Sequence, residues 1–200
     1  MDIKAAVFDA DGVLIKQGER FSSIYAKRVG ISTESMTPFF EGPFKKCLTE
    51  EADLKEELKP FLKGWKWKGS AEEFLDYWFK EEISTNQELV DEIKELRKSG
   101  IKCYMASNQA KYRANYVIKD MGFERFLDGF FISCDFGVTK FQEEFFEKMY
   151  KGISPDGKIG KDEIAFWDDK QSIIDVAKGF GLRTFLYKDV QGFKKDLYSI

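Results

Sequence analysis

Short apolar runs alternate with segments of helical periodicity along most of the chain. Five mainly apolar runs predict buried strands, at residues 3–8, 101–106, 130–132, 164–167 and 183–187. Between them, apolar side chains recur every three or four residues, as in helices with one buried face. The positions with this helical spacing are Leu89, Ile93 and Leu96; Ala114, Val117 and Met121; Phe141, Phe145 and Met149; and Ile173, Ala177 and Phe180. This alternation of strands and helices predicts a parallel α/β sheet.

One long stretch interrupts the alternation. Residues 16–84 show helical patterns and no convincing strand, and Ser70 with Glu73 forms a capping box before an apolar helical face. The pattern therefore predicts an α/β core formed by residues 1–15 and 85–200, with a small helical bundle inserted at residues 16–84.

Composition and charge exclude several classes of function. The chain has 200 residues, of which 43% are hydrophobic, so it can bury a sizeable core. Its net charge of -3 provides no field that attracts nucleic acid or an anionic membrane. It contains no histidine, which excludes Ser/His/Asp and Cys/His catalysis and histidine-ligated metals. Any catalysis must depend on carboxylates, lysine, hydroxyls or thiols.

The cysteines and the N-terminal residues predict a soluble, cytoplasmic protein. Cys47, Cys103 and Cys134 are odd in number and contain no C-x-x-C pair, which argues against a disulfide framework or a zinc ribbon. We expect all three to be packing residues. The N-terminal residues reach Asp9 before they form the apolar region of a signal peptide, and no apolar run is long enough to cross a membrane.

Pairs of carboxylates follow two of the predicted strands. Asp9 and Asp11 come directly after the first strand, and Asp168 and Asp169 after the fourth. Ligands of open parallel sheets bind outside the carboxyl ends of the strands, and carboxylate pairs there suit a divalent cation with oxygen ligands. The alternative for each pair is a turn that only closes its strand.

Ser107, Asn108 and Lys140 are weaker candidates when each is considered alone. Ser107 and Asn108 follow the second strand, where we expect a helix N-terminus that offers free N–H groups to an anion. Both are also ordinary helix-capping residues. Lys140 precedes the predicted helix that begins at Phe141, and an isolated lysine there is usually a surface residue. Beside the acidic strand ends, however, it would be a counter-ion for a phosphate.

The order of these residues resembles the haloacid dehalogenase-like hydrolase superfamily, whose members are mostly phosphatases. The likeness covers residues 3–15 and 86–187: a strand with Asp-x-Asp-Gly, a strand with Ser, a lysine that starts a helix, and a strand with Asp-Asp. It implies a Rossmann-like, doubly wound parallel sheet, with residues 16–84 as a helical cap between the first and second motifs. One departure is Phe141, because family members usually have proline after the lysine.

The resemblance also implies roles for the candidate residues. Asp9 would be the nucleophile that becomes an aspartyl phosphate, and Asp11 the general acid and base. Lys140 would neutralise the charge of the phosphoryl group, which Ser107 and Asn108 would bind. The Mg²⁺ ligands would be Asp9, the backbone carbonyl of Asp11, and the pair Asp168 and Asp169.

The implied activity is Mg²⁺-dependent hydrolysis of a small phosphorylated metabolite, such as a sugar phosphate or a nucleoside monophosphate. The carboxylate of Asp11 favours phosphoryl transfer over dehalogenation, because a leaving alkoxide needs a proton. Two alternatives stay open: a phosphomutase on the same scaffold, and a non-enzymatic domain that binds phosphate or metal.

The aromatic residues Phe39, Phe40 and Phe44 either pack within the cap or face the active site. The 16% aromatic content also leaves room for an apolar interface in a homo-oligomer.

Overall fold

The computed structural model of the protein, which describes residues 3–82 and 84–199, contains one five-stranded parallel sheet. Its strands are β1 (Ala5–Phe8), β2 (Lys102–Ser107), β3 (Gly129–Ile132), β4 (Ile164–Asp168) and β5 (Arg183–Leu186). All five predicted strands are present, with ends shifted by at most two residues. The predicted Rossmann-like α/β fold is therefore confirmed.

The strand order places the ends of β1 and β4 side by side. The order is β3-β2-β1-β4-β5, so the chain winds outward from β1 to β3 and then returns to the other side of β1. Phe8, the last residue of β1, pairs with Met105 of β2 and with Trp167 of β4. This reversal is the switch point at which open α/β sheets bind their ligands.

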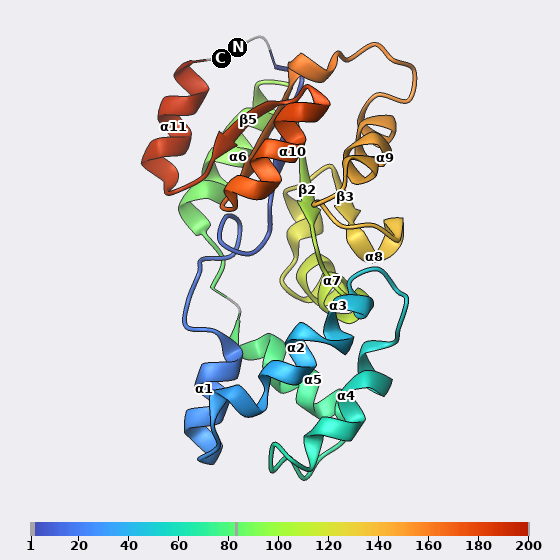
Figure 1. Ribbon diagram of the computed structural model, residues 1–200. Helices are drawn as coiled ribbons and strands as arrows, with labels where there is room; N and C mark the ends of the chain where they lie inside the picture. Colours follow the sequence, from blue (N-terminus) through green and yellow to red (C-terminus); the bar gives the residue numbers. More distant parts are fainter. Residues whose placement is uncertain (1–2, 83, 200) are drawn as a thin grey trace.

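Helices cover both faces of the sheet (Figure 1). One apolar cluster joins alternate β1 residues, Ala6 and Phe8, to helices α6 (Gln87–Lys98) and α11 (Val190–Tyr198) and to the segment after β2. The other joins Ala5 and Val7 to α9 (Glu143–Ile153) and α10 (Gln171–Phe180). The shorter elements of the core are α7 (Lys111–Asn115), the π-helical turn Tyr116–Asp120, α8 (Ser133–Phe136), and the 3-10 turns Phe123–Arg125 and Lys161–Glu163.

The described part of residues 16–84 is helical. Its elements are α1 (Phe21–Val29), a 3-10 turn (Thr33–Ser35), α2 (Thr37–Glu41), α3 (Pro43–Cys47), α4 (Leu54–Leu62) and α5 (Ala71–Glu81). They enclose an apolar cluster of their own, rich in aromatic side chains, and the predicted capping box of Ser70 and Glu73 begins α5. Figure 1 shows this helical segment below the sheet, connected to it by two chain crossings that pair at Ile15 and Thr85.

Two predicted helix starts are wrong. The helix expected from Phe141 begins at Glu143, because Gln142 has an extended backbone and its side chain closes a turn with Thr139. The helix expected directly after Ser107 begins only at Lys111.

The three cysteines are free and buried, as expected of packing residues. Burial raises the pKa of Cys47 to about 11 and those of Cys103 and Cys134 to about 12. Among residues 3–82 and 84–199, no helix is both long and apolar enough to span a membrane.

Candidate active site

Lys140 is buried between two carboxylates at the carboxyl ends of β1 and β4. Its Nζ donates hydrogen bonds to Asp9 Oδ1 at 2.5 Å and to Asp168 Oδ2 at 2.7 Å. None of the three residues exposes more than 3% of its surface. Asp9 follows β1 directly and Asp168 ends β4, so the pairing of these two strands brings the carboxylates together. Each buried charge thus has a partner, without which its burial would be costly.

These contacts shift the pKa of two members of the cluster. Burial alone would lower the pKa of Lys140, but the charges of Asp9 and Asp168 outweigh it and the pKa is raised. The pKa of Asp168 is raised by burial and then by the charge of Asp9, against the opposing effect of Lys140. Lys140 therefore stays cationic at neutral pH.

Asp169 adds a third carboxylate to the cluster. One carboxylate oxygen each of Asp9, Asp168 and Asp169 lie within 4.8 Å of one another. Asp169 Oδ1 is buried with no hydrogen-bond partner in the described residues, and burial, followed by the charge of Asp9, raises the pKa of Asp169. Gly12 passes close by with a φ of +91°, and a Cβ on it would lie 2.5 Å from Asp169 Oδ2, so this backbone path requires glycine. The three carboxylates form an oxygen ligand set that could hold a divalent cation.

Asp11 lies nearer to solvent than Asp9. Its side chain is 54% exposed, and its two oxygens face different donors. Gln109 Nε2 donates to Oδ2, and Arg113 Nη2 lies 3.5 Å from Oδ1. The segment after β2 therefore orients this carboxylate.

Arg113 connects Asp11 to the helical segment. Its side chain is 7% exposed, and Nη2 also donates to the backbone oxygen of Glu82 at 3.2 Å. Nη1 is buried and lacks a hydrogen-bond partner within the described chain. Burial raises the pKa of Glu82 more than the charge of Arg113 lowers it.

The sequence analysis missed Gln109, Arg113 and Glu82. Gln109 follows the end of β2 by two residues, and this position could have identified it as a candidate site residue from the sequence. Arg113 and Glu82 belong to no local motif, and they meet because α7 packs against Phe79 of α5. That contact is a property of tertiary packing alone.

Ser107 and Asn108 do not lie at a helix N-terminus as expected. Ser107 is 1% exposed, and its Oγ accepts a hydrogen bond from Gln109 Nε2 at 3.4 Å. Asn108 Oδ1 accepts a hydrogen bond from the backbone N–H of Lys140 at 2.8 Å. Since α7 begins only at Lys111, neither residue caps it, and Asn108 instead fixes the backbone of the buried lysine.

A cavity of about 470 Å³ lies between the carboxyl ends of the strands and the helical segment. We call these strand ends, with the residues that follow them, the sheet edge. Its lining from the α/β core includes the polar residues Asp11, Asn108, Gln109, Arg113, Asp169 and Lys170. The helical segment contributes the apolar side chains of Phe44, Leu48, Leu54, Trp78 and Phe79. Asp9 and Lys140 do not line the cavity. Lys140 adjoins two lining residues, because Phe141 follows it in the chain and its backbone N–H donates to Asn108. Asp9 has a carboxylate oxygen within 4.8 Å of one of those of the lining residue Asp169.

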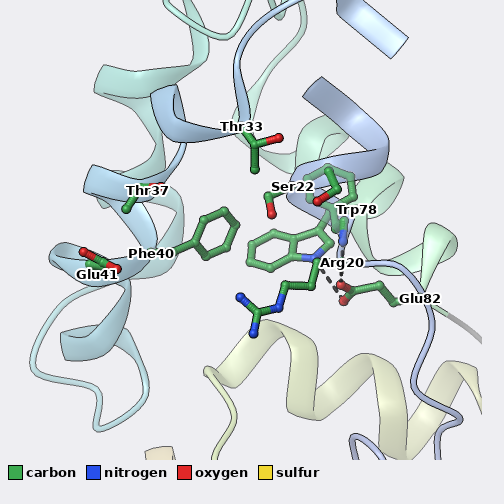
Figure 2. Close-up of a pocket in the computed structure, with 10 residues that line it drawn as sticks. Arg20, Ser22, Thr33, Thr37, Phe40, Glu41, Trp78 and Glu82 are labelled. Atoms are coloured by element: carbon green, nitrogen blue, oxygen red, sulfur yellow. Dashed lines mark hydrogen bonds between the residues drawn. The ribbon is translucent and has the colours of Figure 1, made fainter. Parts of the chain in front are cut away.

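A second cavity, of about 330 Å³, lies within the helical segment. Figure 2 shows Phe40 facing Trp78 there, with the Trp78 indole N–H donating to Glu82 Oε2 at 3.0 Å. The two cavities share Arg20, Trp78 and Glu82, so they adjoin. Asp11 and Asp169 line the larger cavity and not the smaller one, so the larger cavity is the candidate active site.

Several solved structures share this fold. A HAD family enzyme from Bacteroides thetaiotaomicron, bt-2542, matches with a TM-score of 0.76 and 21% identity over 93% of this chain and 94% of that one. The same enzyme has been solved in complex with magnesium and inorganic phosphate. A predicted HAD-like family hydrolase from Porphyromonas gingivalis matches with a TM-score of 0.77 and 19% identity over 98% of both chains.

A structure described as a dehalogenase also matches, with a TM-score of 0.64 and 19% identity over 91% of this chain and 83% of that one. At such identities the likeness shows the fold, and fold does not establish the reaction. Comparison with curated proteins finds no match.

The sequence itself settles the family. A family model for haloacid dehalogenase-like hydrolases matches residues 3–181, a span that contains the five charged candidate site residues Asp9, Asp11, Lys140, Asp168 and Asp169. The chain therefore belongs to the haloacid dehalogenase-like hydrolases.

Proposed function

We propose that this hydrolase cleaves phosphate monoesters of small molecules through an aspartyl phosphate on Asp9. The observation that carries the proposal is the carboxylate of Asp11, which lines the cavity two residues from the buried Asp9. Alkoxide departure requires a proton donor at such a place, whereas a departing halide does not. Asp11 therefore favours phosphate esters over haloacids as substrates.

A Mg²⁺ ion fits the carboxylate cluster. Asp169 Oδ1 is a buried acceptor without a partner in the described residues, and two further carboxylates lie within 4.8 Å. Asp9, Asp168, Asp169 and the backbone carbonyl of Asp11 would hold the cation, which when bound offsets the negative charge of the phosphoryl group. The magnesium complex of bt-2542 supports this choice of metal.

In the first half of the reaction, a carboxylate oxygen of Asp9 attacks phosphorus and the bond to the ester oxygen breaks. Asp11 donates its proton to that departing oxygen. Lys140, held cationic by its two carboxylate contacts, lowers the repulsion between Asp9 and the incoming dianion.

In the second half, Asp11 takes a proton from water as the water oxygen attacks the phosphorus of the aspartyl phosphate. Phosphate leaves, the carboxylate of Asp9 is regenerated, and Asp11 is again protonated. Ser107 and Asn108 bind phosphoryl oxygens in this proposal. For Asn108 the available group is the side-chain amide N–H₂, because Oδ1 already accepts from Lys140.

We assign residues 16–84 as a cap over an α/β core of residues 1–15 and 85–200. Support comes from the separate apolar cluster of the helical segment and from its position across the cavity from the strand ends. A cavity of about 470 Å³ suits a small-molecule ester better than a phosphorylated protein.

The test is phosphate release from p-nitrophenyl phosphate and from a panel of alkyl phosphates, with Mg²⁺ and with EDTA. Haloacetate turnover is measured in parallel. We expect Mg²⁺-dependent phosphate release that EDTA abolishes. Halide release without phosphate release would make the protein a dehalogenase and overturn the proposal. Product analysis with a sugar phosphate, which a mutase would isomerise, separates hydrolysis from transfer.

A further inference from the structure

Phe141 is an exposed aromatic side chain at the candidate active site. It is 54% exposed, although it directly follows a lysine that is 1% exposed. It packs against none of the three apolar clusters found in the described residues, and it lines the larger cavity. A large apolar side chain left in water lacks the stabilisation that burial would provide, and an apolar group bound against it would supply part of that stabilisation.

The backbone around Phe141 is fixed on both sides. Before it, the backbone N–H of Lys140 donates to Asn108 Oδ1 at 2.8 Å. After it, Gln142 N–H donates to the oxygen of Thr139 at 3.0 Å, and Thr139 N–H donates back to Gln142 Oε1 at 3.0 Å. This turn buries Lys140 and presents the next side chain to the cavity.

The lining of the cavity combines charged and apolar side chains. The strand ends contribute Asp11 and Asp169, and the helical segment supplies Phe44 and Leu48, both half-buried, together with Leu54. The helical segment also contributes polar side chains, among them Gln17, Glu19 and Glu82. A phosphate ester bound with its phosphorus near Asp9 would place its ester oxygen toward Asp11. The rest of the alcohol would then extend into the space that Phe141 and the helical segment enclose.

We propose that Phe141, together with Phe44 and Leu48, selects phosphate monoesters whose alcohol carries a planar, apolar ring. This inference rests on the proposed phosphatase activity and names its substrate class. A ring stacked on Phe141 would bury the face of that side chain that is now exposed, and ring pairs gain more than area burial alone. A flexible polyol would gain much less from these three side chains.

The test compares the kcat/KM of phenylethyl phosphate with those of ethyl phosphate and glycerol phosphate. The reacting phosphate is alike in all three, so their ratio reports recognition of the alcohol. We expect the wild type to prefer phenylethyl phosphate by about tenfold. Phe141→Ala should reduce that preference to about twofold or less, and Phe141→Tyr should retain it. The exposed Leu186, which does not line the cavity, provides the control variant Leu186→Ala, in which all three rates should be unchanged.

The outcomes separate the two proposals. If the wild type hydrolyses all three esters equally, or prefers glycerol phosphate, the inference is wrong while the phosphatase activity stands. Equal losses on every ester in Phe141→Ala would also contradict it, since they would mean that Phe141 supports the site without selecting the alcohol. If no ester is hydrolysed, the proposed function itself fails.

Discussion

The sheet edge and the helical segment differ in where their charged side chains lie. At the sheet edge, Asp9, Lys140 and Asp168 are almost fully buried and contact one another. In the helical segment, ion pairs such as that of Lys27 with Glu19 lie on the surface, and the interior is an aromatic cluster. Buried charges hold fixed positions and act strongly on a substrate, whereas apolar surfaces recognise shape. In our proposals the reaction takes place at the sheet edge, and the alcohol is selected by Phe141 of the α/β core together with Phe44 and Leu48 of the helical segment.

The largest effect is expected at the nucleophile. Asp9→Asn should lower the rate of phosphate release by at least about a thousandfold, because an amide cannot form the acyl phosphate. The measurement is steady-state turnover of p-nitrophenyl phosphate with Mg²⁺, with circular dichroism to confirm the fold.

The matched control is Asp128→Asn, which alters another ion-paired carboxylate. Asp128 contacts Arg97 at 3.0 Å and lies outside the candidate active site. This variant should lose stability and keep its kcat. Substantial turnover by Asp9→Asn would remove the covalent step from the mechanism.

The second effect concerns stability. Lys140→Met leaves the buried carboxylates of Asp9 and Asp168 without their shared cation, so we expect the free energy of unfolding to fall by about 3–5 kcal/mol at pH 7. Because the pKa of Asp168 is already raised and should rise further without the lysine, protonation should reduce the loss at lower pH.

Urea unfolding at pH 5 and pH 7 measures this difference. The surface variant Lys27→Met, in the helical segment, should show no measurable change, since its side chain is 73% exposed. If both variants lost the same stability, the contrast between buried and surface charges would have no energetic basis.

The third effect is at Arg113, which joins the two regions. Arg113→Lys keeps the charge but cannot reach both Asp11 and the backbone of Glu82, so Asp11 should be less well positioned to give up its proton. We expect about a tenfold lower kcat on ethyl phosphate and a smaller loss on p-nitrophenyl phosphate, whose leaving group needs no proton. Equal losses on the two substrates would show that Arg113 supports only the fold.

The sequence predicted the sheet and the acidic strand ends because their signals are local. A buried strand is a short apolar run, and the parallel order then brings Asp9, Asp168 and Asp169 to one edge. The contacts of Arg113 and Glu82 were out of reach, because they depend on how α7 packs against α5.

Helix starts were the other failure. Phe141 stands four residues before Phe145 and matches the helical spacing, yet the turn closed by Thr139 and Gln142 excludes it from α9. The regular spacing of apolar residues therefore identified the buried face of the helix but did not identify its first residue.

The smallest effect tests Glu82, a partly buried acid of the helical segment. Burial raises the pKa of Glu82, although Arg113 and the indole N–H of Trp78 favour its charged form. Its pKa in the folded state lies above the unfolded value, so the wild type loses stability as pH rises from about 4.5 through the folded-state pKa. Glu82→Gln stays neutral, and its stability relative to the wild type should therefore increase with pH across that window.

Glu72, in the first turn of the helix that Glu82 follows, provides a control of opposite sign. A backbone hydrogen bond and then a side-chain hydrogen bond from Lys55 lower its pKa, so the charged form is the favoured one in the folded state. The charged Glu72 side chain stabilises the folded wild type, and this stabilisation is lost as pH falls. Glu72→Gln lacks it at every pH, so the stability of this variant relative to the wild type should decrease as pH rises. Urea unfolding of both variants between pH 4 and pH 8 gives the two slopes. Slopes of the same sign would mean that the helical segment does not distinguish a partly buried carboxylate from a surface one, and the contrast with the sheet edge would then rest on Lys140 alone.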